Sequence, residues 1–507
     1  MESRTRNASR NMITGVISKI VSLILPFVAR TVILYALGSA YLGVGTLFTS
    51  VLSFLSLAEL GFSSAITFAM YKPIAEHDTE KICALLNYYR KLYRIIGCVV
   101  LAIGLSIMPI IPLLIKGDLP EELNVYILYL IYLFNSVISY FIAGYRQGLL
   151  SAYQRMDITN ICNFVITTVA YVIQIAAVLA TKNYYVYAFV PILGTVAINI
   201  SNAVISRRMF PKIECRGIVD IETKNKIKKK MGGLFGTKLN SIVVNQADTL
   251  VISAFLGITV VAEYGNYYYI MNAVCGFIMI IFSSLTASVG NKIASDSLES
   301  CYQLFRKISF FNDWIVCVCS VCFVCLYQPF MKLWVGEDLM LSFEFVILFV
   351  VYFFIYEIQR TILTFKDAAG LWYEDRYRPY ASMSINLIFN ILLVQMVGIY
   401  GIVISTIIAF VISLPWANGV LFKNLFRMSP MENIFYIFKN AIVTIVSCVV
   451  AYMASIQCSK GVLGILEVLI ISVIVSNLVF IVFNLNSPTL KSIVLEFRNR
   501  VKRRKDG

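Results

Sequence analysis

The residues of this sequence that could bind a ligand or take part in a reaction are a few ionisable side chains set inside long apolar stretches. They are Arg30, Glu59, Arg146, Asp248, Asp313, Glu357 and Arg360. A charged side chain at the centre of a membrane helix costs about 2.5–3.5 kcal/mol even on insertion scales, so it usually faces a cavity or a partner. We therefore favour a functional role for Arg30 and Asp248. The Asn and Gln side chains of the same stretches are explained more simply as hydrogen bonds between helices.

Other reactive residue types give weaker signals. One apolar stretch carries four cysteines, namely Cys317, Cys319, Cys322 and Cys325. A single helix spreads four thiols around its surface, whereas a metal site needs them to converge, so we interpret them as small buried hydrophobes. His77 is the only histidine, which excludes a His-rich metal site and a conventional catalytic triad. Residues 232–238 lack the spacing of a phosphate loop. We predict neither metal nor cofactor.

The apolar stretches themselves have the length of membrane helices. Hydrophobic residues make up 59% of the 507 residues and charged residues 14%, against about 25% charged in soluble proteins. A bilayer core needs about 20 apolar residues in a helix. Fourteen stretches meet this need, at 12–37, 43–71, 92–115, 125–150, 158–180, 184–205, 234–257, 260–289, 308–327, 341–365, 380–397, 399–421, 434–456 and 463–483. The sequence predicts an all-α integral membrane protein.

Basic residues indicate how these spans are oriented. With the N-terminus in the cytoplasm, only four of the 43 Lys and Arg residues fall in outer loops, namely Lys116, Lys182, Lys332 and Lys460. Cytoplasmic loops carry the excess of Lys and Arg in membrane proteins, so both termini are predicted to be cytoplasmic. The net charge of +15 is explained by this topology and needs no nucleic acid. The densest run, residues 224–230, can rest on anionic lipid headgroups.

Spans seven to twelve look like a repeat of spans one to six. Residues 29–33 match residues 247–251, and Cys83 with the Arg-Lys pair after it matches Cys301 in the same way. A six-span repeat returns to its starting side, so the two copies would be related by an axis along the membrane normal. The predicted organisation is an N-lobe at 1–210, a basic cytoplasmic linker at 211–233, a C-lobe at 234–425, and the last two spans with a basic tail at 426–507.

Several short motifs resemble the polysaccharide-transporter branch of the MATE-like multidrug/oligosaccharidyl-lipid/polysaccharide exporters. The motifs are Arg30-Thr31 with Leu37-Gly38, residues 53–61 around Glu59, residues 71–75, residues 152–155, Asp248 in its span, and residues 398–402. The resemblance covers nearly the whole chain and is most specific in the first 75 residues.

The resemblance implies a twelve-helix core of two lobes with two peripheral helices. It also implies a flippase of the bacterial cell membrane that exports undecaprenyl-pyrophosphate-linked oligosaccharide repeat units from the inner to the outer leaflet by alternating access. Such units build O-antigen, capsule or exopolysaccharide, and the motifs do not specify the sugar. The expected partners are the lipid-linked substrate and membrane lipids, with a polysaccharide polymerase and glycosyltransferases as further candidates.

A pyrophosphate would need a cation inside the protein, and Arg is the residue best suited to bind it. Arg30 is the first candidate for pyrophosphate or sugar binding, and Arg146 and Arg360 are the next candidates. The carboxylates Asp248, Glu59, Asp313 and Glu357 are candidates for coupling or gating. Arg30 and Asp248 occupy the same repeat position with opposite charges, so we hypothesise that their attraction biases the outward-closed state.

Two other functions stay open from the sequence. A MATE-type exporter driven by cations would need acidic residues such as Glu59, Asp248 and Asp313, although Arg30 in the first span favours an anionic substrate. A membrane-embedded sugar transferase would need a sizeable outer loop and a base, and the outer loops are short. We therefore expect a transporter rather than an enzyme.

The orientation is directly testable. Reporter fusions after Lys116 and after Lys332 should both report the outer side of the membrane, because both lie in predicted outer loops. Alkaline phosphatase and green fluorescent protein at the same junctions give complementary signals. A cytoplasmic signal at either junction would contradict the topology.

Overall fold

The structure is a computed structural model, and it describes residues 21–59, 62–117, 119–459, 461–493 and 495. Its described secondary structure is entirely helical, which confirms the predicted all-α class. The chain separates into two compact units, Met1–Ala262 and Glu263–Gly507. Each unit is described by itself. The lobe boundaries inferred from the sequence at residues 210 and 234 stay a prediction.

The first unit begins with the helix Val21–Ala36. It continues with α2 (Ser39–Leu55), the 3₁₀ turn η1 (Ser56–Glu59), α3 (Phe62–Ala75), α4 (Thr79–Ile107), η2 (Met108–Leu114), α5 (Val125–Phe141), α6 (Tyr145–Ala152), α7 (Met156–Thr181), α8 (Tyr184–Met209) and α9 (Ile221–Phe255). Helix α9 packs against α2 and α3 of the same unit.

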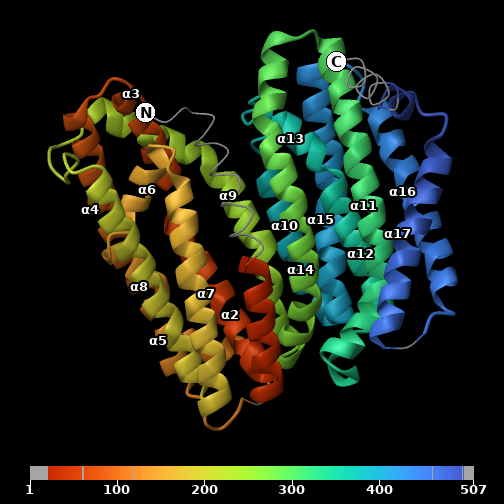
Figure 1. Cartoon of the computed structure of the whole chain (residues 1–507), viewed down its shortest axis with the longest axis horizontal. Coiled ribbons are helices and arrows are strands. Elements are labelled where there is room, and N and C mark those ends of the chain that lie inside the picture. Colours follow the sequence, from red (N-terminus) through yellow and green to blue (C-terminus); the bar gives the residue numbers. More distant parts are fainter. Residues whose placement is uncertain (1–20, 60–61, 118, 460, 494, 496–507) are drawn as a thin grey trace, which may run out of the picture. The chain divides into compact units, whose positions relative to one another are not determined.

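The second unit takes up most of α10 (Ile258–Ser295), which begins just before the boundary between the units. It continues with α11 (Leu298–Trp334), η3 (Glu337–Leu339), α12 (Phe343–Ile358), α13 (Arg360–Ala368), α14 (Arg378–Val397), α15 (Ile399–Leu421), the π-helical η4 (Phe422–Phe426), α16 (Met431–Ser455) and α17 (Val462–Asn484). Figure 1 shows α16 and α17 running beside α11, and all three pack together.

Polar residues at the edges of the apolar stretches begin the helices. Asp78 accepts a hydrogen bond from the backbone N–H of Lys81 at the start of α4. Asn124 and Asn183 do the same for the first turns of α5 and α8. Such caps satisfy backbone donors that have no partner within the helix. The capped ends therefore fall where the sequence changes from loop to span.

Among the described residues, ten helices are long and apolar enough to cross a membrane, and the pair α5 and α6, bent by 53°, makes an eleventh candidate. Three of the predicted spans have no such helix. The span at 12–37 lies partly outside the described residues, the span at 43–71 is divided between α2 and α3, and the span at 234–257 is part of α9. The protein is a multi-pass membrane protein, and the count of fourteen stays a prediction.

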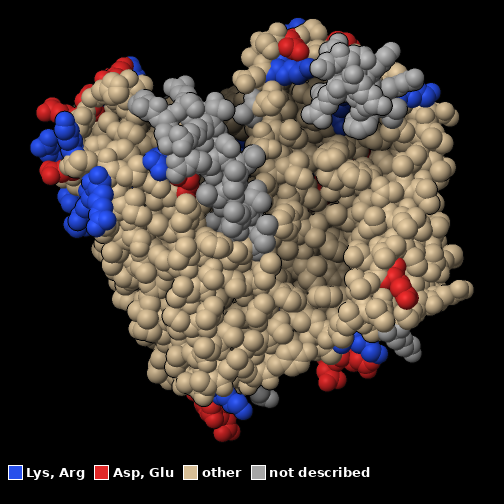
Figure 2. Space-filling model, in the orientation of Figure 1, with Lys and Arg blue, Asp and Glu red and all other residues tan. Residues whose placement is uncertain are grey.

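The surface agrees with this placement in a bilayer. On the face shown in Figure 2, the charged side chains of each unit gather mostly near the ends of its helices. Broad uncharged surface lies between these ends. A lipid-facing belt needs this distribution, because charged groups are costly in hydrocarbon.

The cysteine-rich helix packs tightly in the second unit. Cys317 lies in an apolar cluster with Phe310, Val443 and Phe480, and Cys325 belongs to a second such cluster with Val468 of α17. The Sγ of Cys317 also contacts the Ser447 hydroxyl at 3.6 Å. These thiols fix α11 against α16 and α17. Among the described residues, no group of His, Cys, Asp and Glu side chains is arranged to hold a metal.

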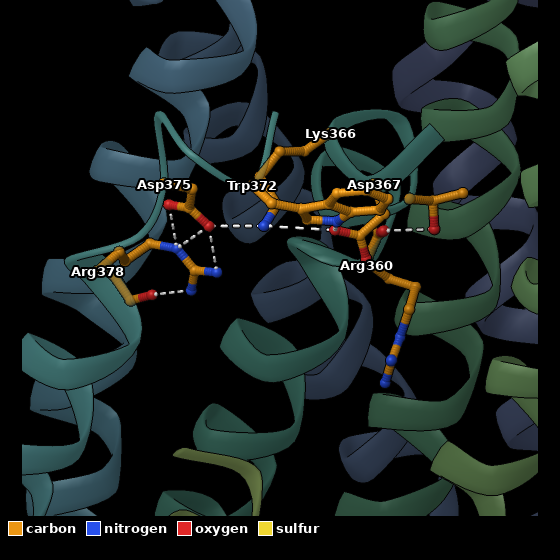
Figure 3. Close-up of polar contacts among 8 residues, drawn as sticks. Arg360, Lys366, Asp367, Trp372, Asp375 and Arg378 are labelled. Atoms are coloured by element: carbon orange, nitrogen blue, oxygen red, sulfur yellow. Dashed lines mark hydrogen bonds and ion pairs between the residues drawn. The ribbon is translucent and has the colours of Figure 1, made fainter. Parts of the chain in front are cut away.

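A buried ionic cluster holds the loop between α13 and α14 (Figure 3). The Nζ of Lys366 donates to Asp375 at 2.6 Å, and the Arg378 guanidinium donates to the same carboxylate at 2.7–3.0 Å. The remaining guanidinium nitrogen of Arg378, Nη1, donates to the Ser413 hydroxyl on α15. Asp375 is 2% exposed, so its charge balances two cations inside the protein. The two acidic residues at 374 and 375, followed by Arg376 and Arg378, were the sequence signal for this cluster.

Asp375→Asn should destabilise the second unit strongly. Removing one partner of a buried ion pair typically costs about 3–5 kcal/mol, because the remaining charges stay buried without compensation. The unfolding temperature of the purified protein in detergent measures the loss. The matched control is Glu374→Gln, since Glu374 is exposed on the same loop. Equal unfolding temperatures for the two variants would contradict the role given to Asp375.

Candidate functional site

The first unit contains a polar cavity of about 420 Å³. Its walls come from η1, α3, α4, α6 and the start of α7. The lining residues are Glu59, Ser63, Ser64, Thr67, Phe68, Tyr71, Tyr89, Tyr93, Gly144, Gln147, Gly148, Ser151, Met156 and Thr159. Most of them carry hydroxyl groups or aromatic rings. The volume falls in the range of small-molecule sites.

Glu59 is the one charged side chain among the described lining residues, and tyrosines donate to both of its carboxylate oxygens. The Tyr93 hydroxyl donates to Oε1 at 2.8 Å, and the Tyr140 hydroxyl donates to Oε2 at 3.1 Å. Within the described part of the chain, no Lys or Arg forms an ion pair with Glu59. Two neutral donors therefore fix the carboxylate, and no described cation pairs with it.

Helical spacing brings the other lining groups to one side. Ser63, Thr67 and Tyr71 follow one another at intervals of four along α3, so they share one face. Tyr89 and Tyr93 have the same interval on α4, and their rings pack edge to face at 4.8 Å. The Tyr89 hydroxyl donates to Ser63 at 2.5 Å and so links the two helices.

Two glycines make room for the tyrosines. A Cβ at Gly148 would lie 2.4 Å from the Tyr89 ring, and a Cβ at Gly97 would lie 2.8 Å from the Cβ of Tyr140. Both distances are far shorter than a van der Waals contact. Gly148 and Gly97 therefore allow α4 to approach α6 and α5 closely enough to position the phenols.

The chemistry of this cavity is acidic and rich in hydroxyl groups. Serine, threonine and tyrosine hydroxyls both donate and accept hydrogen bonds, while an ionised carboxylate only accepts them. Among the described residues, no Lys or Arg lines the wall. Such a site suits a neutral polyhydroxylated ligand or a cationic one, and Glu59 would repel a phosphate.

A second polar cavity of about 310 Å³ lies in the same unit, between α5, α7 and α8. Tyr132, Asn135, Gln174 and Tyr187 are among its lining residues. Arg30 lies near it, because its charge acts on the hydroxyls of Tyr187 and of the neighbouring Tyr184. Arg30 thus interacts electrostatically with Tyr187 in the wall of the second cavity, whereas the described lining of the first contains no Lys or Arg.

The predicted pair, Arg30 and Asp248, lies within one unit. Arg30 is half-buried, and its Nη2 donates to the backbone oxygen of Ala262 at 3.2 Å. Asp248 is buried on α9. Both belong to the unit Met1–Ala262. Their roles in binding and gating stay predictions.

The other two arginines differ in environment. Arg360 forms a bidentate ion pair with Glu357 at 2.7 and 3.0 Å, and its guanidinium lies over the Tyr356 ring. In Figure 3 its side chain runs away from the Asp375 cluster. Arg146 is buried on α6 and forms no ion pair with a described residue. Glu357 is thus a partner of Arg360 in this conformation.

Asp313 lies where the last two helices dock. It is buried on α11 and accepts a hydrogen bond from Asn440 of α16 at 2.7 Å. The nearby Arg306 stacks on the Tyr436 ring at 3.9 Å. The structure brings Glu357 and Arg360 together and places Asp313 with Asn440 and Glu59 with tyrosines. Sequence reasoning missed Tyr93 and Tyr140, because tyrosines are common in membrane helices and nothing local marks these two.

Known proteins with similar sequence or structure were compared with the chain. The family model described as polysaccharide biosynthesis protein matches residues 8–286. The sequence search against curated proteins gave no match. Among solved structures, the lipid II flippase MurJ in an inward closed conformation has a TM-score of 0.66 at 14% identity, covering 94% of this chain and 99% of that one.

Two MATE transporters share the fold as well. An inward-facing multidrug resistance MATE transporter has a TM-score of 0.59 at 16% identity, covering 79% of this chain and 93% of its own. The MATE transporter VcmN of Vibrio cholerae has a TM-score of 0.57 at 12% identity, covering 84% and 100%. These solved relatives are transporters rather than enzymes. At such identities the likeness concerns the fold.

Gly148→Ala should disturb the first cavity. The added methyl group meets the Tyr89 ring, and overpacking of this kind costs about 1–3 kcal/mol. The unfolding temperature should fall, and the purified protein measures it. Gly194→Ala is the control, because a Cβ there meets only the Ala170 methyl at 3.5 Å. An unchanged unfolding temperature for Gly148→Ala would show that α4 and α6 are not in close contact.

Proposed function

Because the chain belongs to the polysaccharide biosynthesis protein family, we propose that it is a flippase for lipid-linked oligosaccharides. The substrate is an undecaprenyl-pyrophosphate-linked repeat unit, which moves from the inner to the outer leaflet of a bacterial cell membrane. Translocation proceeds by alternating access and serves surface polysaccharide synthesis. Polymerase and glycosyltransferases are the neighbouring enzymes that would consume and supply the substrate.

The observation that carries this proposal is the cavity around Glu59. Sugar hydroxyls donate and accept hydrogen bonds, and the wall offers both kinds of partner from Ser63, Thr67 and Gln147. The faces of Tyr71 and Tyr89 offer apolar surface for the C–H faces of a sugar ring. A volume of about 420 Å³ accommodates a small number of sugar units. The negative charge of Glu59 would repel the pyrophosphate from this cavity.

The pyrophosphate needs a different contact, which we assign to Arg30. A guanidinium binds phosphate oxygens through two parallel N–H donors. Arg30 is half-buried and donates from Nη2 to the Ala262 carbonyl, Arg360 forms an ion pair with Glu357, and Arg146 is buried. Arg146 and Arg360 would contact the substrate only in a conformation that exposes or releases them.

Coupling and gating are assigned to the carboxylates. Asp248, in the same unit as Arg30, is proposed to bias one state by attracting that guanidinium, in competition with the pyrophosphate. Glu59 is proposed to couple the occupancy of its cavity to transport. Asp313 would take part through the contact of α11 with α16. Glu357 would take part through the ion pair that joins α12 to Arg360.

A cation-coupled exporter of small molecules is the second candidate, because no described Lys or Arg pairs with Glu59, and its acidic cavity suits a cation. Expression in a strain that lacks its own flippase separates the two functions. Restored surface polysaccharide with unchanged susceptibility to cationic dyes supports the flippase. Lowered susceptibility to dyes without polysaccharide would support the exporter.

Arg30→Ala should abolish export of surface polysaccharide, and Arg30→Lys should keep part of it, because Lys retains the charge but loses the bidentate geometry. Polysaccharide on intact cells and the amount of protein in the membrane are measured together. Arg94→Ala is the control, since Arg94 is an exposed arginine of α4 in the same unit. Normal polysaccharide in the Arg30→Ala strain would remove Arg30 from the substrate site.

A further inference from the structure

Three buried side chains of the first unit carry polar atoms that have no hydrogen-bond partner. Arg146 is 4% exposed, Asn202 is 1% exposed and Ser206 is fully buried. The unpartnered atoms are Nε and Nη1 of Arg146, both polar atoms of the Asn202 amide, and the Ser206 hydroxyl. Buried polar groups normally find partners, so a cluster of this kind needs an explanation.

The helices place these residues against one another. At about 100° per residue, Gln147, Gly148 and Ser151 form the cavity face of α6, and Arg146 lies well away from that face. Helix α6 also packs against α8, which carries Asn202 and Ser206. The guanidinium therefore points away from the Glu59 cavity and toward α8.

A polar ladder between the neighbouring helices gives the register. Thr195 donates to Asn135 at 3.0 Å, and Asn199 donates to Ser139 at 3.2 Å, so both bonds join residues 60 apart. The same spacing from Arg146 leads to Ser206, and Asn202 lies one turn earlier on the same face of α8. This register would place the three side chains next to one another beyond the bend of 53° between α5 and α6.

No carboxylate among the described residues balances the Arg146 charge. Asp157 is buried nearby in sequence but pairs with Arg155 at 3.0 Å. The closest recorded interaction of the guanidinium is with the Tyr145 hydroxyl, which is neutral and also accepts from Cys215. A buried guanidinium without a counter-charge is costly, and water alone does not cancel its charge.

We propose that Arg146, Asn202 and Ser206 form an occluded site for a small inorganic anion. Two guanidinium N–H groups, the Asn202 amide N–H and the Ser206 hydroxyl can all donate to one anion. The burial of all three residues excludes a sugar or a prenyl chain, so a halide or a single phosphate fits the donors. Arg146 lies outside the lining of the Glu59 cavity, and the anion would bind to it in the conformation in which this side chain is enclosed and does not contact the substrate.

The bound anion would join α6 to α8 just beyond the bend. The segment after α8 covers this region, because the Asn87 amide donates to the Gly217 carbonyl and Cys215 contacts Tyr145. Occupancy should therefore stabilise the end of the first unit that the predicted topology places in the cytoplasm. Binding of the anion should appear as a stability of the folded protein that depends on anion concentration.

The first test measures the unfolding temperature of the purified full chain in detergent. Sodium chloride replaces sodium gluconate stepwise at constant ionic strength, since gluconate is too large for an occluded site. We expect the temperature to rise and saturate, and phosphate is titrated in parallel. At an anion concentration tenfold above the dissociation constant, the equilibrium constant for folding should rise about elevenfold. Arg94→Gln should keep the effect and Arg146→Gln should lose it.

Asn202→Asp supplies an internal anion and guards against a variant that fails to fold. Its carboxylate should pair with Arg146, raise the unfolding temperature without chloride or phosphate, and abolish the dependence on either. A crystal soaked in bromide should show an anomalous peak between Arg146, Asn202 and Ser206 in the unaltered protein. Ordered water with no anomalous peak, or stability of the unaltered protein that is indifferent to both anions, would overturn the proposal.

Discussion

Every polar group that a membrane helix carries inward must find its partner inside the protein, because hydrocarbon offers none. This constraint explains most of the contacts in both units. Arg360 meets Glu357, Asp375 meets Lys366 and Arg378, and the ladder between α5 and α8 pairs amides with hydroxyls. The positions where pairing is incomplete are therefore informative.

Two positions of the first unit stand out against this background. The Glu59 carboxylate is hydrogen-bonded by Tyr93 and Tyr140, and no Lys or Arg among the described residues forms an ion pair with it. The Arg146 guanidinium is buried without a counter-charge among the described residues. One position borders an open cavity and the other is enclosed. A ligand with hydroxyl groups fits the first, and a small anion fits the second.

The two parts of the proposed substrate also need different kinds of contact. Its sugars need hydrogen-bond partners and apolar ring faces, while its pyrophosphate needs a cation. The acidic cavity and Arg30 lie apart in the first unit, near different ends of the polar ladder. Keeping the two kinds of contact apart prevents Glu59 from weakening the phosphate contact through repulsion.

Hydropathy and charge are local properties, and they determined much from the sequence alone. The all-helical class, the membrane placement and the family resemblance came from runs of residues and short motifs. The residues that would matter could be named, because an ionisable side chain in an apolar stretch is costly wherever it points. Glu59, Arg360 and Asp313 were recognised on this basis.

Their partners were decided only by tertiary structure. Tyr93 and Tyr140 reach Glu59 from 34 and 81 residues away, and Asn440 reaches Asp313 from 127 residues away. No spacing rule links such positions, because the contacts depend on how separate helices pack. Packing decided that Arg360 is paired, that Arg146 is enclosed, and that Glu59 borders a cavity. The sequence names the costly charges, and the fold determines how each one is compensated.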